Sequence, residues 1–174
     1  FDCIEFNPEL RWIDVMNEVA FLVMDFQAAG RTDFARRFLN GYLEATGDYA
    51  GLRVLRYYCA YRAMVRAKVM LMRACQQGCT SEDQVSATAL FGRYLSVAAG
   101  CAQPFRSFVL ITHGFSGSGK TTLSQPLVEL TGAIRVRSDV ERKRIHGLAA
   151  KDRPGSGIAE GLYLSTSPDL LPRL

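Results

Sequence analysis

Residues 114–121 carry the clearest chemical pattern of the chain. They read GFSGSGKT and match G-x-x-x-x-G-K-[ST], the pattern of a phosphate-binding loop. Glycines at the first, fourth and sixth positions allow backbone conformations closed to other residues, so that successive N–H groups point at a phosphate. The helix that follows adds its positive end. The pattern predicts binding of a nucleoside triphosphate, and a glycine-rich surface turn is the alternative.

The loop residues have separate expected tasks. Lys120 brings positive charge to the β- and γ-phosphates, and Thr121 offers its hydroxyl to a metal ion. ATP and Mg²⁺ are therefore the expected ligands, with Thr121 as the metal-binding residue. The expected nucleotide contacts come from Gly114, Phe115, Ser116, Gly117, Ser118, Gly119, Lys120, Thr121 and Thr122.

A second candidate group follows residues 133–137, which read AIRVR and predict a strand. Ligands of open α/β sheets bind at the carboxyl ends of the strands, so Asp139 is expected on the same sheet edge as the phosphate loop. A carboxylate there can orient an acceptor hydroxyl and take its proton, and Arg142 can hold phosphate or acceptor oxygens. The alternative is that Asp139 only caps a helix beginning at Val140.

The elements that position these residues form an expected α/β unit. The apolar run 107–112 predicts a buried strand before the loop, and residues 123–131 predict the first helix, ended by Gly132. Pro126 lies inside that helix, where a proline removes one backbone hydrogen bond and clashes with the previous turn. We therefore expect a kink or an early break there.

The preceding part of the chain has a different pattern. Helical periodicity predicts helices over 13–29, 33–45, 49–75 and 85–100, the last opened by a capping box at residues 81–84. The boundary is expected near Pro104. The predicted fold is an α-helical part over residues 1–103, followed over residues 104–174 by an incomplete α/β P-loop unit with parallel strands.

GFSGSGKT followed by IRVRSDVERKR resembles the small P-loop kinases of the gluconate kinase, polynucleotide kinase and chloramphenicol phosphotransferase type. The resemblance covers residues 107 to about 150 and implies phosphoryl transfer, with Asp139 facing the acceptor. That family has further strands, a second carboxylate for the metal and an arginine-bearing lid. Only about 35 residues follow Asp139, so we expect an incomplete domain.

Residues 1–25 are similar to the tail of the aminoglycoside phosphotransferase and choline kinase fold. In that family a metal-binding Asp ends a strand, and a second Asp twelve residues later opens the first of several helices. Asp2 and Asp14 have this separation. The two resemblances together imply a bacterial protein type that joins such a domain to a P-loop kinase domain. This chain is expected to be an internal fragment spanning the junction, inactive by itself.

Composition narrows the expected partners. A net charge of +4 is mild and is accounted for by a nucleotide ligand. A small hydroxylated metabolite is the favoured acceptor. A nucleic-acid end is the alternative, because basic residues gather near Asp139. It is less favoured, since no aromatic residues that could stack on bases are interleaved with them. These basic residues are Arg135, Arg137, Arg142, Lys143 and Arg144.

Two further interpretations remain open at this stage: a non-catalytic nucleotide-binding or interaction module, and a helical bundle with a fortuitous glycine loop. No apolar run reaches the length of a membrane span. Five cysteines, an odd number, and no apolar export signal favour a cytoplasmic protein without a disulfide framework. The sequence predicts no oligomeric state.

Overall fold

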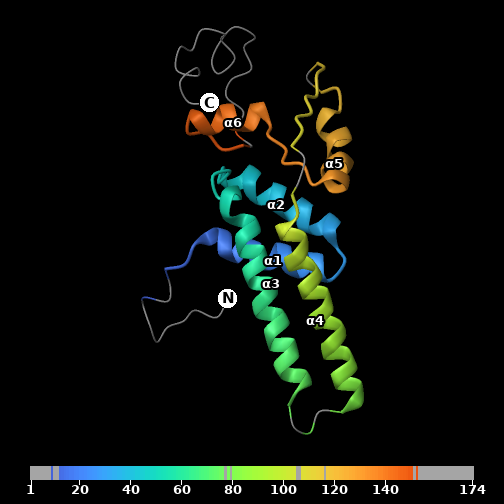
Figure 1. Ribbon diagram of the computed structural model, residues 1–174. Coiled ribbons are helices and arrows are strands. Elements are labelled where there is room, and N and C mark those ends of the chain that lie inside the picture. Colours follow the sequence, from blue (N-terminus) through green and yellow to red (C-terminus); the bar gives the residue numbers. More distant parts are fainter. Residues whose placement is uncertain are drawn as a thin grey trace.

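The computed structural model describes residue 9 and residues 12–76, 78, 80–104, 107–115, 117–150 and 152. Within these residues it contains six α-helices and no strand (Figure 1). The helices are α1 (Val15–Ala28), α2 (Thr32–Thr46), α3 (Leu52–Ala74), α4 (Ser81–Ala102), α5 (Lys120–Thr131) and α6 (Ser138–Ile145). The first four confirm the helices predicted from periodicity, with end points that differ by a few residues.

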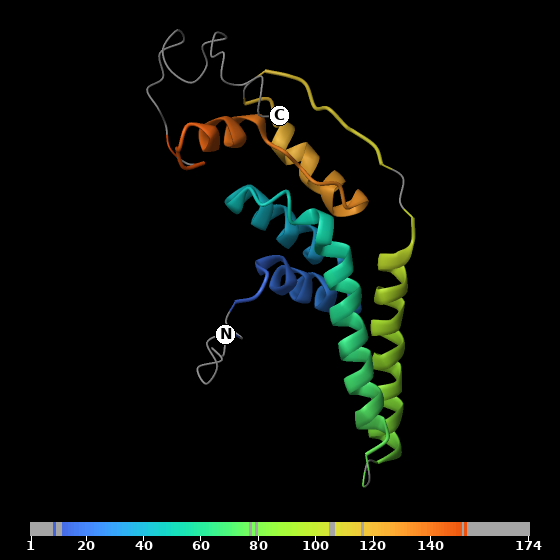
Figure 2. The same cartoon turned by 60° about the vertical axis from the view of Figure 1, so that its left-hand side comes forward.

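Helices α3 and α4 form a long antiparallel hairpin, and α1 and α2 lie across one end of it (Figures 1 and 2). Helix α1 is central, because it packs on α2, α3 and α4 and buries Met16, Val19, Ala20, Val23 and Met24. Val15, the first residue of the same helix, is 60% exposed. Helix α2 lies between α1 and α5.

Side-chain and glycine caps fix the helix ends of this part. Asp14 precedes α1 and accepts a hydrogen bond from the Met16 amide at 2.9 Å, as expected of a residue that opens a helix. Gly47 ends α2 in the left-handed conformation, with φ of 77°. The predicted capping box at residues 81–84 is displaced by one residue: Thr80 is the cap, and its hydroxyl oxygen accepts from the Asp83 amide at 3.2 Å.

The two predicted strands are absent from the described residues. Residues 107–115 have no regular secondary structure and run as an extended trace (Figure 2), and Val109 and Ile111 are 88% and 84% exposed. Residues 132–137 are also irregular. A strand exists only where its backbone groups pair with a neighbouring strand, and neither segment has such a neighbour in the described part. In the described residues, the predicted α/β unit thus contains helices and irregular segments but no strand.

Of the two outcomes expected at Pro126, a kink or an early break, the break does not occur. Helix α5 runs from Lys120 to Thr131 with Pro126 in its interior, and Gly132 ends it with φ of 73° as predicted. Proline removes the hydrogen bond to the carbonyl of residue 122, and Thr122 is exposed, so water can replace that bond.

None of the described helices has the length and apolar composition needed to cross a membrane.

Candidate phosphate site and its junction with α2

The glycine-rich loop has the backbone geometry that its pattern predicts. Gly114, Gly117 and Gly119 have φ of 148°, 78° and 79°, values that L side chains rarely adopt. Helix α5 begins directly after Gly119, so the loop leads into a helix N-terminus with its unpaired N–H groups. Ser116 lies outside the described residues. A glycine-rich turn that leads into a helix N-terminus is the arrangement with which phosphate-binding loops hold anions.

Lys120 turns back into the loop. Its ammonium donates to the carbonyl oxygens of Gly114 at 2.7 Å and Phe115 at 2.6 Å, and it lies 3.4 Å from the Ser118 hydroxyl. An ammonium has three donors and no acceptor. The loop therefore already concentrates oxygen ligands around this charge, and phosphate oxygens could replace the carbonyl oxygens as its partners.

Asp139 does not cap helix α6. The helix begins at Ser138, its cap position is Arg137 without a side-chain cap bond, and Asp139 lies inside the first turn. The alternative of a capping role is therefore wrong. The Asp139 carboxylate is 43% exposed and lies 3.3 Å from the Lys143 ammonium, one turn along the same helix.

Arg142, partly buried, lies on α6 as well. Within the described residues α5 and α6 do not pack extensively on each other, whereas α5 packs on α2. The predicted approach of Asp139 and Arg142 to the phosphate loop thus stays a prediction.

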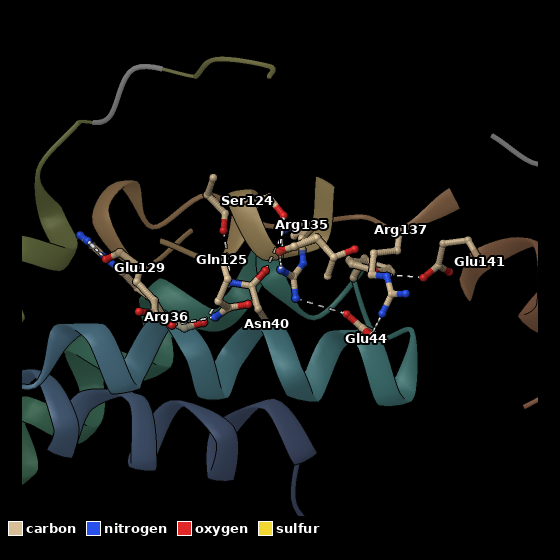
Figure 3. A network of polar contacts seen from close by, with 12 residues as sticks. Arg36, Asn40, Glu44, Ser124, Gln125, Glu129, Arg135, Arg137 and Glu141 are labelled. Carbon is tan, nitrogen blue, oxygen red and sulfur yellow. Dashed lines mark hydrogen bonds and ion pairs between the residues drawn. The ribbon is translucent and has the colours of Figure 1, made fainter. Parts of the chain in front are cut away.

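Helix α2 supplies a row of polar side chains that the sequence interpretation missed. Arg36, Asn40 and Glu44 are spaced four residues apart and contact the chain from the last turn of α5 to the residue before α6 (Figure 3). The signal was present in the spacing, because residues four apart share a helix face while Leu39 and Leu43 face the core. What the spacing does not reveal is the partner of that face.

Two arginines bind helix ends at this junction. Arg36 donates to the carbonyl oxygens of Glu129 and Leu130 at 2.7 Å each, in the last turn of α5, where carbonyls have no partner within the helix. Arg144 of α6 donates to the Glu44 carbonyl near the end of α2 and pairs with Glu141. Each guanidinium thereby places positive charge at the negative end of a helix.

Glu141 has a second partner in Tyr49, whose hydroxyl donates to it at 3.0 Å. Burial raises the pKa of Tyr49, and the hydrogen bond to Glu141 raises it further. The tyrosine therefore stays protonated and keeps its donor role at neutral pH.

A cavity of about 370 Å³ opens between α2 and the C-terminal part. Its lining residues are Arg37, Asn40, Gly41, Glu44, Ala45, Gln125, Arg135 and Ala150. Five of the eight lining residues have polar or charged side chains, of both signs, so water can form hydrogen bonds there.

Comparison with known proteins supports the phosphate loop. Residues 109–170 match the sequence profile of a family described as an AAA domain, which includes the loop and Asp139. This match supports a P-loop, nucleotide-binding, kinase-like part in that stretch. No solved structure matches the chain significantly.

The chain is also similar to proteins described only as uncharacterized, from two strains of Mycobacterium tuberculosis and from Mycobacterium bovis. The identity is 35% over 162 residues in each case, covering 93% of this chain and 31% of each relative. The chain thus spans about a third of the length of the curated relatives it matches. The aligned residues span both the helical part and the phosphate loop of this chain.

Proposed function

We propose that this chain is part of an ATP-dependent kinase that transfers the γ-phosphoryl group to a hydroxyl of a small molecule. The observation that carries the proposal is the GFSGSGKT loop, whose three glycines with positive φ lead directly into α5 at Lys120. The match of residues 109–170 to an AAA domain supports it. We also propose that residues 104–174 form the P-loop domain, because α4 ends at Ala102 and Gln103 is extended.

The residues have distinct roles in this reaction. Lys120 leaves the carbonyls of the loop for the β- and γ-phosphates, and Thr121 binds Mg²⁺. Asp139 orients the acceptor hydroxyl and takes its proton as the acceptor oxygen bonds to the γ-phosphorus and the bond to ADP breaks. Arg142 neutralises charge on the transferred group. In this proposal residues 107–112 and 133–137, which pair with no strand in the described structure, become parallel strands when the active domain assembles, and that sheet brings these groups together.

The helical part has its own proposal. Because Asp14 opens α1 and three helices, α2, α3 and α4, pack on it, we propose that residues 1–103 derive from the C-terminal helices of an aminoglycoside phosphotransferase-like fold. Asp2, the other residue of that resemblance, lies outside the described residues.

A non-catalytic nucleotide-binding module is the second candidate. It is favoured by the lack of extensive packing between α5 and α6, which leaves the carboxylate and the loop on separate elements. A nucleic-acid end as acceptor is a lesser candidate. Arg135, Arg137 and Arg144, which contributed to the basic cluster, are engaged with Glu44 and Glu141.

Calorimetric titration with Mg·ATP tests the proposal. Lys120→Ala should weaken binding by roughly tenfold or more, because a charge-assisted contact to the phosphates contributes about 1.5–3 kcal/mol. Lys68→Ala is the matched control, since Lys68 is an exposed lysine on α3 in the helical part. Equal affinity of the wild type and Lys120→Ala would contradict nucleotide binding at this loop.

A further inference from the structure

Asn40 contacts the chain after α5 as a neighbouring strand would. It is 5% exposed, its amide nitrogen donates to the Ala133 carbonyl at 3.2 Å, and its amide oxygen accepts from the Arg135 amide at 2.7 Å. These bonds flank Ile134, and a residue of a parallel neighbouring strand makes the same pair through its own N–H and C=O. One side-chain amide of α2 thus replaces one backbone peptide unit of a sheet neighbour (Figure 3).

The contacts of α2 follow the chain in order from the end of α5 to the start of α6. Arg36 holds the last turn of α5, Asn40 holds residues 133–135, and Glu44 lies 3.6 Å from Arg135 and 2.8 Å from Arg137. Ile134 packs against the core of the helical part. The segment that was predicted to be a strand is therefore fixed to α2 by hydrogen bonds and two ion pairs, and Ile134 adds an apolar contact with the core.

Arg135 extends this connection to the phosphate loop. Its guanidinium is 3.4 Å from the Thr121 carbonyl and 3.4 Å from the Ser124 hydroxyl, both in the first turns of α5. Its side chain is 18% exposed, and its Nε is buried without a hydrogen-bond partner among the described residues. A guanidinium held this closely depends on Glu44 for its placement, because a partly buried charge needs its counter-charge.

We propose that Glu44 is a positioning residue for the nucleotide site: through Arg135 it fixes the first turn of α5, so that docking of α2 and binding of Mg·nucleotide at the loop are coupled. The proposal rests on the nucleotide binding proposed above. Thr121 is both the residue whose carbonyl Arg135 contacts and the residue proposed to bind Mg²⁺, so the coupling should act mainly on the magnesium-dependent part of the affinity. Such coupling is reciprocal, and bound Mg·ATP should stabilise the docked α2.

Titration of ATP with and without Mg²⁺ on the full chain tests this coupling. Glu44→Gln should lower the affinity for Mg·ATP by about fivefold, near the lower limit for coupled sites because the pair is partly exposed, and should change Mg²⁺-free binding less. Glu18→Gln is the matched control. Glu18 is 30% exposed compared with 26% for Glu44, and it pairs with Arg62 at 2.6 Å inside the helical part.

Thermal unfolding provides a second readout. Saturating Mg·ATP should raise the Tm of Glu44→Gln less than that of the wild type, and the Glu18→Gln variant should respond as the wild type does. If Glu44→Gln does not fold, Arg135→Lys serves in its place, because it keeps the charge but loses the planar fork that spans Glu44 and α5.

The outcomes separate the two proposals. Equal Mg·ATP affinity and equal Tm response in Glu44→Gln and Glu18→Gln would overturn the coupling alone. Absence of Mg·ATP binding by the wild type would overturn the proposed function, and the coupling with it. A loss of affinity that is the same with and without Mg²⁺ would overturn the proposed route through Thr121.

Discussion

At the scale of single residues, backbone carbonyl groups of the glycine-rich loop hold the Lys120 ammonium inside the loop. Lys120 has carbonyl partners at 2.6 and 2.7 Å within the loop, so its charge is already directed into the curve of the chain. In the proposed nucleotide complex, phosphate oxygens replace these carbonyl oxygens, which limits the desolvation cost of the ammonium. Asp139, by contrast, pairs with Lys143 on its own helix, and its part in catalysis needs a kinetic test.

Substitution of Asp139 by Asn separates a catalytic base from a surface ion pair. In any preparation that transfers phosphate, Asp139→Asn should reduce kcat by roughly 10² or more with little change in ATP affinity, because the base is removed while the shape stays. Lys143→Met removes the same ion pair and keeps the carboxylate, so it is the control. Steady-state kinetics with wild-type kcat in the Asn variant would exclude Asp139 as the base.

Cys101 is a second residue whose chemistry is set by its neighbours. The proton of the buried Cys59 thiol has two acceptors in reach, the Ala20 carbonyl at 3.7 Å and the sulfur of Cys101, and a thiolate is the better acceptor. This hydrogen bond, aided by the charge of Arg56, lowers the pKa of Cys101 to about 7, although burial opposes the shift. The thiolate of Cys101 is thus favoured in the folded chain.

The pH dependence follows from the sign of that shift. A free cysteine has a pKa of about 8.5, so Cys101 contributes stability that is present above this value and is lost as the pH falls through about 7. Alkylation of Cys101, followed by mass spectrometry over a pH series, should have its midpoint near the lower value. Cys59→Ala should move the midpoint upward, and an unchanged midpoint in that variant would show that Cys59 does not control it.

At the scale of elements, helices differ from extended segments in where their backbone hydrogen bonds are made. A helix makes them within itself, and an extended segment needs a neighbouring element. Helix α3 makes its hydrogen bonds locally and buries Leu55, Cys59, Ala63 and Ala67 at a spacing of four residues. Residues 107–115 form no helix, so their backbone groups lack such hydrogen bonds within the segment. The segment at 133–135 is intermediate, because Asn40 supplies two of the bonds that a strand neighbour would make.

Amide hydrogen exchange should reproduce this order. We expect rapid exchange over residues 107–112, strong protection in α3 around Cys59 and Ala63, and protection of the Arg135 amide within an otherwise irregular segment. Asn40→Ala should remove the protection of Arg135 and leave that of α3 largely unchanged. Protection of residues 107–112 equal to that of α3 would show that they pair as a strand.

At the scale of the whole molecule, α2 is the element that unites the chain. One face packs on α1 with Leu39 and Leu43, and the adjacent face binds the chain from α5 to α6 through Arg36, Asn40 and Glu44. The apolar contacts are insensitive to orientation, while the hydrogen bonds require particular geometry. The apolar face of α2 thus joins it to the helical part, and the polar face joins it to the chain from α5 to α6.

The sequence by itself determined what depends on local interactions. Helical periodicity located α1 to α4, the loop pattern required positive φ at Gly114, Gly117 and Gly119, and Gly47 and Gly132 marked helix ends. Each of these features depends on residues within a few positions of each other, so the sequence pattern predicts them. Local rules failed at residue 81, where Thr80 is the cap, and at Pro126, where the remaining helical bonds of α5 tolerate one missing donor.

Only the tertiary structure decided what depends on distant partners. The sequence pattern of residues 133–137 is the same whether a neighbouring strand or the Asn40 side chain supplies the hydrogen bonds. The residues around Asn40 in the sequence do not indicate that its partner lies 93 residues away. The pairing of Glu44 with Arg135 and Arg137 has the same character. Such bonds form because a polar group buried at a junction must find a partner there, and the identity of that partner is fixed by how the elements pack.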